Sequence, residues 1–445
     1  MKWIVLGGLL ALIAPLTILL RSQPKFLMHA CFVMGLMVFF FDPYLNIGPV
    51  TWEWTGVIKG IEITIVDIIA ISILLATRPV RTPLSIRIGL GIYVLALIVS
   101  TLASELRTPA IFYMWQFCRA VVVFLAIARA TVAQSGAPFA LVAGIGTATI
   151  IEAIVAAQQY LSGTALNGAG GTLGHRNILG LTSHFAVMPA FALLLAGRRN
   201  LPAIAVVVAG AVIALTGGGR ATIGLYGIGL VLTTILSIRH KMTGRKGALA
   251  GLALLLLILS APAMVWAVDR RSLEDRISSD GERAAMTAAA RMIIADHPLG
   301  IGPNQYVVTA NLGGYSERAG VAWNFANRTA PVHNSYLLVW AESGLLGLIG
   351  LLTMLVSAVV LGLKAMRRLA WDERSELMIG LLATLIVAGA HIAFEWLFMT
   401  NYVHYLLAMS AGGLVGITAT LNRKSGSRVV QRRPTAETDF ASQPV

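Results

Sequence analysis

Charged side chains are scarce in this chain of 445 residues, and their scarcity excludes the most common class of protein. They make up 12% of the residues, whereas a soluble globular protein averages roughly 25%. Hydrophobic residues account for 57%, and the mean hydropathy is +0.78. Apolar runs of about 20 residues recur along the chain, as in transmembrane helices. The ten-residue alternation of a membrane barrel is missing, so we expect an all-α polytopic membrane protein.

Cysteine is almost absent as well. Cys31 and Cys118 are the only two, and both fall inside apolar runs, so the sequence predicts no disulfide framework. The candidate outer loops contain no Asp-x-Asp motif and no cluster of histidine and aspartate. We therefore expect no metal site and no cofactor.

Acidic residues are few, with 20 against 34 basic ones, which gives a net charge of +14. A nucleic-acid partner is not indicated, because the basic residues lie in short loops between apolar runs and in the tail. In such loops they set membrane topology by the positive-inside rule. The loops near residues 78–87, 198–199, 239–246 and 364–374 and the tail alternate along the chain, so all can be cytoplasmic together. The stretches opposite them would then share the outer face, and the bilayer is the first expected partner.

The apolar runs predict about 12 or 13 transmembrane helices and one large outer loop. Residues 1–267 would form an N-terminal bundle, 268–335 a periplasmic loop with short helices, 336–421 C-terminal transmembrane helices and 422–445 a disordered cytoplasmic tail. The first run lacks a small-x-small cleavage site and is interpreted as an uncleaved helix. The expected spans are 3–20, 26–41, 58–77, 86–102, 110–131, 138–160, 178–196, 201–216, 220–238, 247–267, 336–363, 375–398 and 402–421.

Three stretches on the predicted outer face carry unusual polarity. In TGGGRAT (216–222), Arg220 follows three glycines, which let backbone approach a ligand, and its guanidinium can fork onto phosphate oxygens. A snorkelling interfacial arginine would look the same. In DGERAAMTAAARMIIADHPLGIGPNQY (280–306), Arg283 opens an amphipathic helix that ends at Pro298, with Arg291 two turns later. A surface helix with salt bridges is the alternative interpretation.

The third stretch is PVHNSYLLVWAESGLLG (331–347). His333 precedes an apolar run in which Asn334 or Ser335 can cap the helix, and histidine can take up a proton near neutral pH. Glu342 lies deeper, where an ionisable group is costly and usually has a partner or a task. An ordinary helix cap would also explain His333 and Asn334. Together, two arginines and one histidine on one membrane face predict a site that binds an anionic, phosphate-bearing lipid and deprotonates a hydroxyl.

These motifs resemble those of the O-antigen ligase and polymerase superfamily. The family patterns are an "HN-x-Y-L" start followed by a glutamate and "GLLGL", an arginine-bearing helix before "HP-L-G-x-G", an arginine after a serine- or threonine-rich turn, and an "N-x-(L/F)-(A/G)" helix entry. Two positions depart from these patterns: Gly219 stands where a serine is frequent and Thr287 where an aromatic is frequent. The matching residues are His333, Asn334, Tyr336, Leu337, Glu342, Gly344, Leu345, Leu346 and Gly347; Arg283, His297, Pro298, Leu299, Gly300 and Gly302; Arg220; Asn177 and Gly180.

The resemblance implies a GT-C type membrane glycosyltransferase of the bacterial inner membrane with its active site on the periplasmic side. It would transfer a glycan from an undecaprenyl-diphosphate carrier, with inversion and without metal, during assembly of O-antigen, capsule or exopolysaccharide. His333 would act as the base, while Arg220 and Arg283 would hold the diphosphate. Expected substrate contacts are Asn334, Tyr336, Arg291, Arg119, Asn177 and Glu342.

The acceptor stays open. A polymerase would extend a carrier-linked polysaccharide, and a ligase would use lipid A core or a protein. Further partners implied by the resemblance are a polysaccharide flippase and a chain-length regulator.

Other ionisable residues inside apolar runs suggest alternatives. Arg119 is the best candidate for an extra phosphate or glycan contact, while His391 and Glu395, four residues apart, would share a helix face and could simply fix helix packing. Together with Asp67 and Glu152, such groups also motivate a transporter of anions or of the lipid-linked glycan. No pair of interrupted spans accompanies them, as a transporter of inverted repeats would require. A structural scaffold that docks partners on the outer loop is a further alternative.

Overall fold

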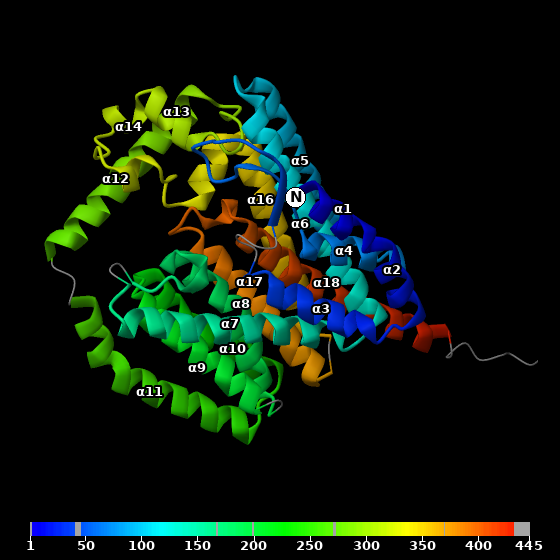
Figure 1. Ribbon diagram of the computed structural model, residues 1–445. Coiled ribbons are helices and arrows are strands. Elements are labelled where there is room, and N and C mark those ends of the chain that lie inside the picture. The colour runs from blue at the N-terminus through cyan, green and yellow to red at the C-terminus, as the bar shows by residue number, and fades with distance from the viewer. Residues whose placement is uncertain are drawn as a thin grey trace, which may run out of the picture.

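The protein is an assembly of α-helices with one small two-stranded sheet, as the computed structural model shows (Figure 1). Within the described part of the chain, ten helical stretches are long and apolar enough to cross a membrane. The predicted all-α polytopic membrane fold is confirmed. The described residues are 2–40, 46–165, 168–197, 200–269, 273–368 and 370–430.

Within 2–161, the described residues form seven α-helices and the two-stranded sheet. The expected span 3–20 is divided at Leu12 into two helices, and the first strand lies between the expected spans 26–41 and 58–77. The elements are α1 (Lys2–Ala11), α2 (Ile13–Ser22), α3 (Phe26–Met37), β1 (Asn46–Thr51), β2 (Gly60–Thr64), α4 (Ile65–Ala76), α5 (Leu84–Ala103), α6 (Arg107–Ala133) and α7 (Ala137–Leu161).

In the second half of the chain, one helix of 24 residues and three short helices stand between two groups of long helices. These four helices lie within residues 273–334, which are called the outer segment. The elements are η1 (Gly171–Leu173), α8 (Arg176–Leu195), α9 (Asn200–Gly217), α10 (Arg220–His240), α11 (Gly244–Asp269), α12 (Leu273–Asp296), α13 (Tyr306–Leu312), α14 (Tyr315–Arg318), α15 (Phe325–Arg328), α16 (Ser335–Met366), α17 (Glu373–His391), η2 (Leu397–Met399) and α18 (Asn401–Val430).

Two expected spans are shorter than the apolar pattern suggested. The run 58–77 begins as strand β2, and its helix starts only at Ile65, because Thr64 and Asp67 form a reciprocal capping box there. The run 375–398 ends as a helix at His391. His391 and Glu395 therefore do not share a helix face, contrary to the prediction. The chain turns instead, and the Ser335 amide donates to the carbonyl oxygens of Ile392 and Glu395 at 2.9 and 3.0 Å.

The C-terminal tail also differs from expectation at its start. Residues 422–430, predicted to be disordered, continue α18 to Val430. Residues 431–445 lie outside the described residues, as do Arg198 and Arg199 of an expected cytoplasmic loop.

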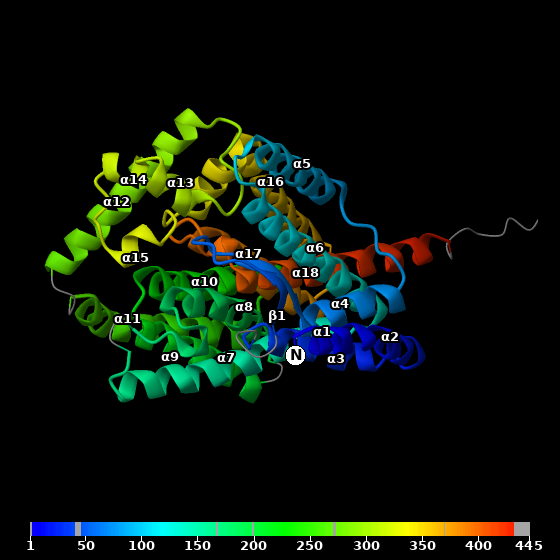
Figure 2. The same ribbon diagram turned by 45° about the horizontal axis from the view of Figure 1, so that its top comes forward.

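Helices α8 and α17 run through the middle of the bundle, and α12–α15 lie together at one end of it (Figures 1 and 2). Nearly every residue of α8 is buried, although a helix on the rim of a bundle would expose one face to lipid. The pair α5 and α16 lies side by side in both views. The chain passes from the outer segment into the bundle at Ser335, where α16 begins.

A kink in α16 joins the outer segment to the bundle. Gly344 has φ 68°, and a Cβ there would lie 2.9 Å from the Pro298 carbonyl oxygen, so glycine is required on both counts. Across this contact Ile301 N donates to Ala341 O at 3.0 Å, and Gly302 N donates to Glu342 O at 2.9 Å. The glycine-rich motifs of the two stretches therefore pack against each other.

Candidate functional site

Glu395 is the centre of a polar cluster at the end of the bundle. Its Oε2 lies 2.9 Å from His333 Nδ1, and its Oε1 accepts from Arg283 Nη2 at 3.0 Å and from Asn177 Nδ2 at 2.8 Å. These groups come from the entry to α16, from α12, from α8 and from the turn after α17. The tertiary structure thus brings three sequence-predicted residues together on one carboxylate, which we call the Glu395 cluster.

The helix entries around the cluster are fixed by ordinary capping chemistry. Asn334 caps α16, because its Oδ1 accepts from the amides of Tyr336 and Leu337 at 3.0 and 3.1 Å. Ser335 Oγ donates to the Glu395 carbonyl at 2.6 Å, and Tyr336 Oη donates to the Gly389 carbonyl at 2.6 Å. These bonds hold the start of α16 against the end of α17, so the positions of His333 and Glu395 are coupled.

The entry to α8 is organised by a histidine outside the matched motifs. His175 caps this helix by accepting from the Asn177 amide at Nδ1, and its ring lies edge-on to Trp396. Burial lowers the pKa of His175, so its imidazole stays neutral near pH 7. This cap holds the start of α8, from which Asn177 donates to Glu395.

The charge state of Glu395 follows from its surroundings. Its side chain is 3% exposed, and burial alone would raise its pKa. The hydrogen bond and charge of His333 and the charge of Arg283 outweigh burial, so the pKa of Glu395 lies below its ordinary value. The carboxylate is ionised at neutral pH and acts as an acceptor only. His333 therefore donates through Nδ1–H to the carboxylate, which leaves Nε2 as its basic nitrogen.

A cavity of about 430 Å³ lies beside the Glu395 cluster. Arg220 at the start of α10 is 44% exposed and forks onto Asp280 of α12, with one nitrogen–oxygen distance of 2.6 Å. Arg283 is 36% exposed and also faces this cavity. Its full lining is Arg220, Ala221, Gly224, Leu225, Ile228, Asp280, Arg283 and Phe394. The cavity thus presents two guanidinium groups, which suit an anion with several oxygens.

Arg291 lies farther along α12, on the face that also carries Arg283. Both line a second, shallow hollow of about 600 Å³ together with Thr287. The two hollows share Arg283, so an extended ligand could follow α12 from Arg220 to Arg291. This arrangement is compatible with the predicted substrate contact of Arg291.

Two predicted contacts lie elsewhere. Arg119 is 5% exposed inside the bundle and pairs with Asp67 at 2.9 Å and Glu62 at 3.7 Å. Glu342 is 3% exposed and accepts from the amides of Gln305 and Tyr306 at 3.0 and 2.9 Å. The first fixes helix packing and the second orders the turn after α12, so neither is brought to the cavity.

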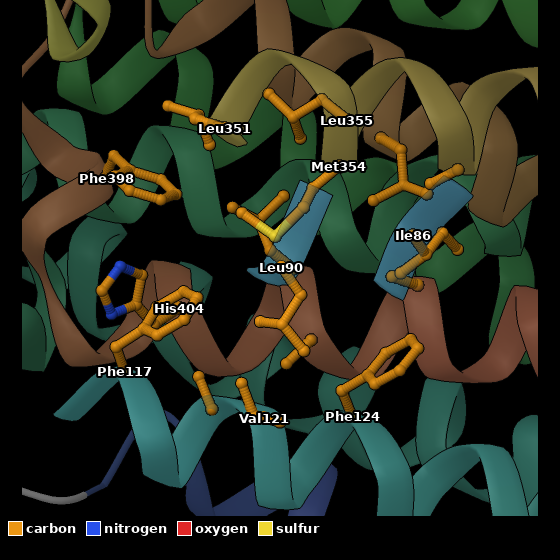
Figure 3. Close-up of a pocket in the computed structure, with 16 residues that line it drawn as sticks. Ile86, Leu90, Phe117, Val121, Phe124, Leu351, Met354, Leu355, Phe398 and His404 are labelled. Carbon is orange, nitrogen blue, oxygen red and sulfur yellow. The ribbon is translucent and has the colours of Figure 1, made fainter. Parts of the chain in front are cut away.

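An apolar pocket of about 130 Å³ lies between α5, α6, α16 and α18 (Figure 3). His404 is its one polar lining residue; its Nδ1 lies 2.9 Å from Gln116 Nε2, while Phe117 and Phe398 flank the ring. The pocket contains none of the residues of the Glu395 cluster. Among the described residues, no group of three or more histidine, cysteine, aspartate or glutamate side chains is placed to hold a metal ion.

Sequence reasoning missed Glu395 and Asp280 as parts of the site. Glu395 carried a signal, because it is an ionisable residue in an apolar run. It was assigned to a helix face shared with His391, so no contact with His333 was predicted. Asp280 stands three residues before Arg283 and gave no separate signal.

Comparison with protein families identifies the central part of the chain. The family model described as O-antigen ligase matches residues 203–352. This range includes Arg220, Arg283 and His333, while Asn177 and Glu395 lie outside it. The match confirms the family resemblance of the motifs that lie within this range. No curated protein matches the chain.

Proposed function

We propose that this protein, whose residues 203–352 belong to the O-antigen ligase family, transfers a glycan from an undecaprenyl-diphosphate carrier to an acceptor hydroxyl. The family and the membrane-spanning helices establish a membrane protein of glycan transfer in polysaccharide assembly. The donor, the mechanism and the periplasmic location in the bacterial inner membrane are parts of the proposal.

One observation carries the proposal: a buried carboxylate joins a histidine to an arginine beside a cavity that holds a second arginine. Glu395 contacts His333 at 2.9 Å and Arg283 at 3.0 Å, and Arg283 and Arg220 line the same cavity. Glycan transfer from a diphosphate needs a base next to an anion site. The Glu395 cluster and this cavity supply both within one end of the bundle.

The reaction follows from these positions. The acceptor oxygen attacks the anomeric carbon, and the bond from that carbon to the phosphate oxygen breaks. The acceptor proton passes to His333 Nε2, while the departing diphosphate keeps the electron pair. Glu395 holds the Nδ1 proton, fixes the tautomer and stabilises the imidazolium that forms. Attack opposite the leaving group inverts the anomeric carbon.

The two arginines take the place that a metal ion has in many phosphate-transfer sites. Arg220 and Arg283 would each fork onto diphosphate oxygens and stabilise the charge that develops as the carbon–oxygen bond breaks. Arg291 would continue this basic track along α12, and Asn177 would hold Glu395 in place through its 2.8 Å bond. Asn334 and Tyr336 would position His333 through the start of α16, as their bonds indicate. For Arg119 and Glu342 we propose roles in the fold, because their contacts lie within it.

Two acceptors fit this chemistry. A polymerase would use a carrier-linked polysaccharide, and a ligase would use lipid A core or another terminal acceptor. The proposal includes a flippase that delivers the carrier-linked glycan and, for a polymerase, a chain-length regulator.

The test uses purified protein in nanodiscs with undecaprenyl-diphosphate-linked glycan, and with carrier-linked repeat and lipid A core offered separately. His333→Ala, Arg220→Ala and Arg283→Ala should each abolish most transfer while the thermal melt is retained. His29→Ala and Arg81→Ala are matched controls, because both residues are exposed and lie away from the cluster. The acceptor that is consumed identifies polymerase or ligase. Full transfer by His333→Ala would refute the base role, and absence of transfer by the wild type would favour a transporter or scaffold.

A further inference from the structure

Two of the most exposed aromatic side chains lie in the outer segment, close to the candidate site. Trp323 is 79% exposed and Phe325 is 85% exposed. Both stand at or just before α15, a helix of four residues in the stretch between α12 and α16, none of whose helices is long enough to cross a bilayer. Lipid-facing packing therefore does not account for them, although it accounts for exposed leucines on the long helices.

The segment that carries Trp323 is held firmly by an arginine. The Arg328 guanidinium lies 4.2 Å from the centre of the Trp323 ring, and Arg328 donates to the carbonyl oxygens of Val321 and Ala322 at 2.6 and 3.3 Å. Asn324 caps α15 by accepting from the Asn327 amide at 2.8 Å. One face of the indole is thus backed by a cation, and the ring is ordered although most of its surface is free.

Further contacts join the segment of this aromatic pair to the site. The Ala322 amide donates to Glu282 Oε2 at 3.2 Å, and Glu282 is the sequence neighbour of Arg283. On the other side, α15 leads within five residues to His333. In Figure 2, α15 lies between α12 and α17 in the view. The segment that carries the pair is therefore joined to the Glu395 cluster on two sides, next to Arg283 through Glu282 and to His333 through the chain.

We infer that Trp323 and Phe325 form a stacking platform for pyranose rings of the glycan substrate, outside the reacting centre. The inference rests on the proposed function, because the pair meets the glycan only if the glycan is bound at His333 and Arg283, to which the segment of the pair is joined. Pyranose rings have an apolar face of C–H groups, which packs on an aromatic ring, and hydroxyls at the edge, which stay in water or meet amides such as those of Asn324 and Asn327. Rigid aromatics bind such rings with little loss of conformational entropy, and Arg328 supplies the rigidity here.

The experiment measures transfer kinetics and glycan binding in parallel. The variants are Trp323→Ala, Phe325→Ala and the conservative Trp323→Tyr. Leu312→Ala is the matched control, because Leu312 is equally exposed at 85% in the neighbouring α13. The binding probe is the glycan released by mild acid from the lipid fraction of cells that lack this protein. Contact of the glycan with the nanodisc-embedded protein is read by saturation-transfer NMR.

We expect the KM for the glycan substrate to rise roughly two- to tenfold in each alanine variant, with kcat at saturation little changed. Trp323→Tyr and Leu312→Ala should behave as the wild type, and saturation transfer to the glycan should weaken only in the alanine variants. Unchanged KM and unchanged saturation transfer in Trp323→Ala would overturn the platform.

Two outcomes separate this inference from its rivals. If the wild type transfers no glycan but shows saturation transfer that Trp323→Ala loses, the platform stands and the proposed reaction fails. If brominated lipids quench the fluorescence that Trp323→Phe removes, Trp323 lies in the bilayer surface and the platform is refuted.

Discussion

Two arginine–carboxylate clusters among the described residues differ in how well a ligand could reach their arginines. In the Glu395 cluster, Arg283 is 36% exposed, and it faces a cavity of about 430 Å³. In the inner cluster, Arg119 is 5% exposed and is bound to Asp67 at 2.9 Å, while Tyr405 Oη donates to the same carboxylate at 2.6 Å. Both carboxylates are nearly buried, at 3% and 7%.

The comparison shows why a buried charge is a weak signal of function by itself. The inner cluster joins α4, α6 and α18 and lines none of the three cavities described above, and its charges bind one another. The Glu395 cluster adds a histidine and leaves an arginine partly free for a ligand. We therefore expect substitutions in the inner cluster to change stability and those in the outer cluster to change activity.

The largest effect should come from Arg119→Ala. Removal of one partner leaves Asp67 buried without its cation, which should lower the free energy of unfolding by roughly 3–5 kcal/mol. Thermal or denaturant unfolding in detergent measures it, and activity per folded molecule should stay near that of the wild type.

A double replacement, Arg119→Met with Asp67→Leu, sharpens this prediction. It removes both charges, so it should be less destabilising than Arg119→Ala alone. Specific activity that collapses in a fully folded Arg119 variant would show instead that Arg119 contacts substrate.

Glu395→Gln should have the next largest effect, and this effect should be on activity rather than on stability. The amide cannot stabilise an imidazolium on His333, so kcat should fall roughly 100-fold. Donor KM should change little, and the melting temperature at neutral pH should fall only slightly, because the amide keeps the shape of the side chain but loses its charge. A large loss of melting temperature with normal kcat would place Glu395 with the inner cluster.

Asp280→Asn should have a smaller effect, which is an improvement in donor binding. Asp280 and the diphosphate would compete for Arg220, and the pair is half exposed, so its strength is at most about 1 kcal/mol. We expect the donor KM to fall roughly two- to fivefold with unchanged kcat. Titration with inorganic pyrophosphate should show the same shift, and a weaker affinity in the variant would assign Asp280 a supporting role.

The smallest effect concerns acid stability. The pKa of Glu395 is lower in the folded protein than its ordinary value of 4.5, so its contribution to stability is present above that value and is lost as pH falls through the folded pKa. The melting temperature of the wild type should therefore fall towards that of Glu395→Gln as pH is lowered from neutral to below 4.5. Parallel melting curves for the two proteins across this range would contradict the ion pairs drawn for Glu395.

Local patterns predicted the parts of the site that lie next to a helix start. His333 and Asn334 precede an apolar run and Arg220 follows glycines, so each was visible in a short window of sequence. Arg283 was visible too, but the prediction that it opens its helix was wrong, because α12 begins at Leu273. Glu395 was misassigned because the apolar run continues past His391, whereas the helix stops where Ser335 binds the carbonyls of the turn. That stop depends on a contact 60 residues away in sequence.

The sequence by itself determined the membrane environment and the approximate helical spans, and it pointed to the histidine and arginines of the candidate site, because hydropathy and helix entry are properties of neighbouring residues. Only the tertiary structure decided which arginine meets which carboxylate. Glu395 and Asp67 are both acidic residues in apolar surroundings, yet one is placed beside His333 and a cavity and the other is enclosed by Arg119 and Tyr405. The physical reason is that a buried charge takes its role from its partners and from its access to ligand, and packing between distant helices fixes both.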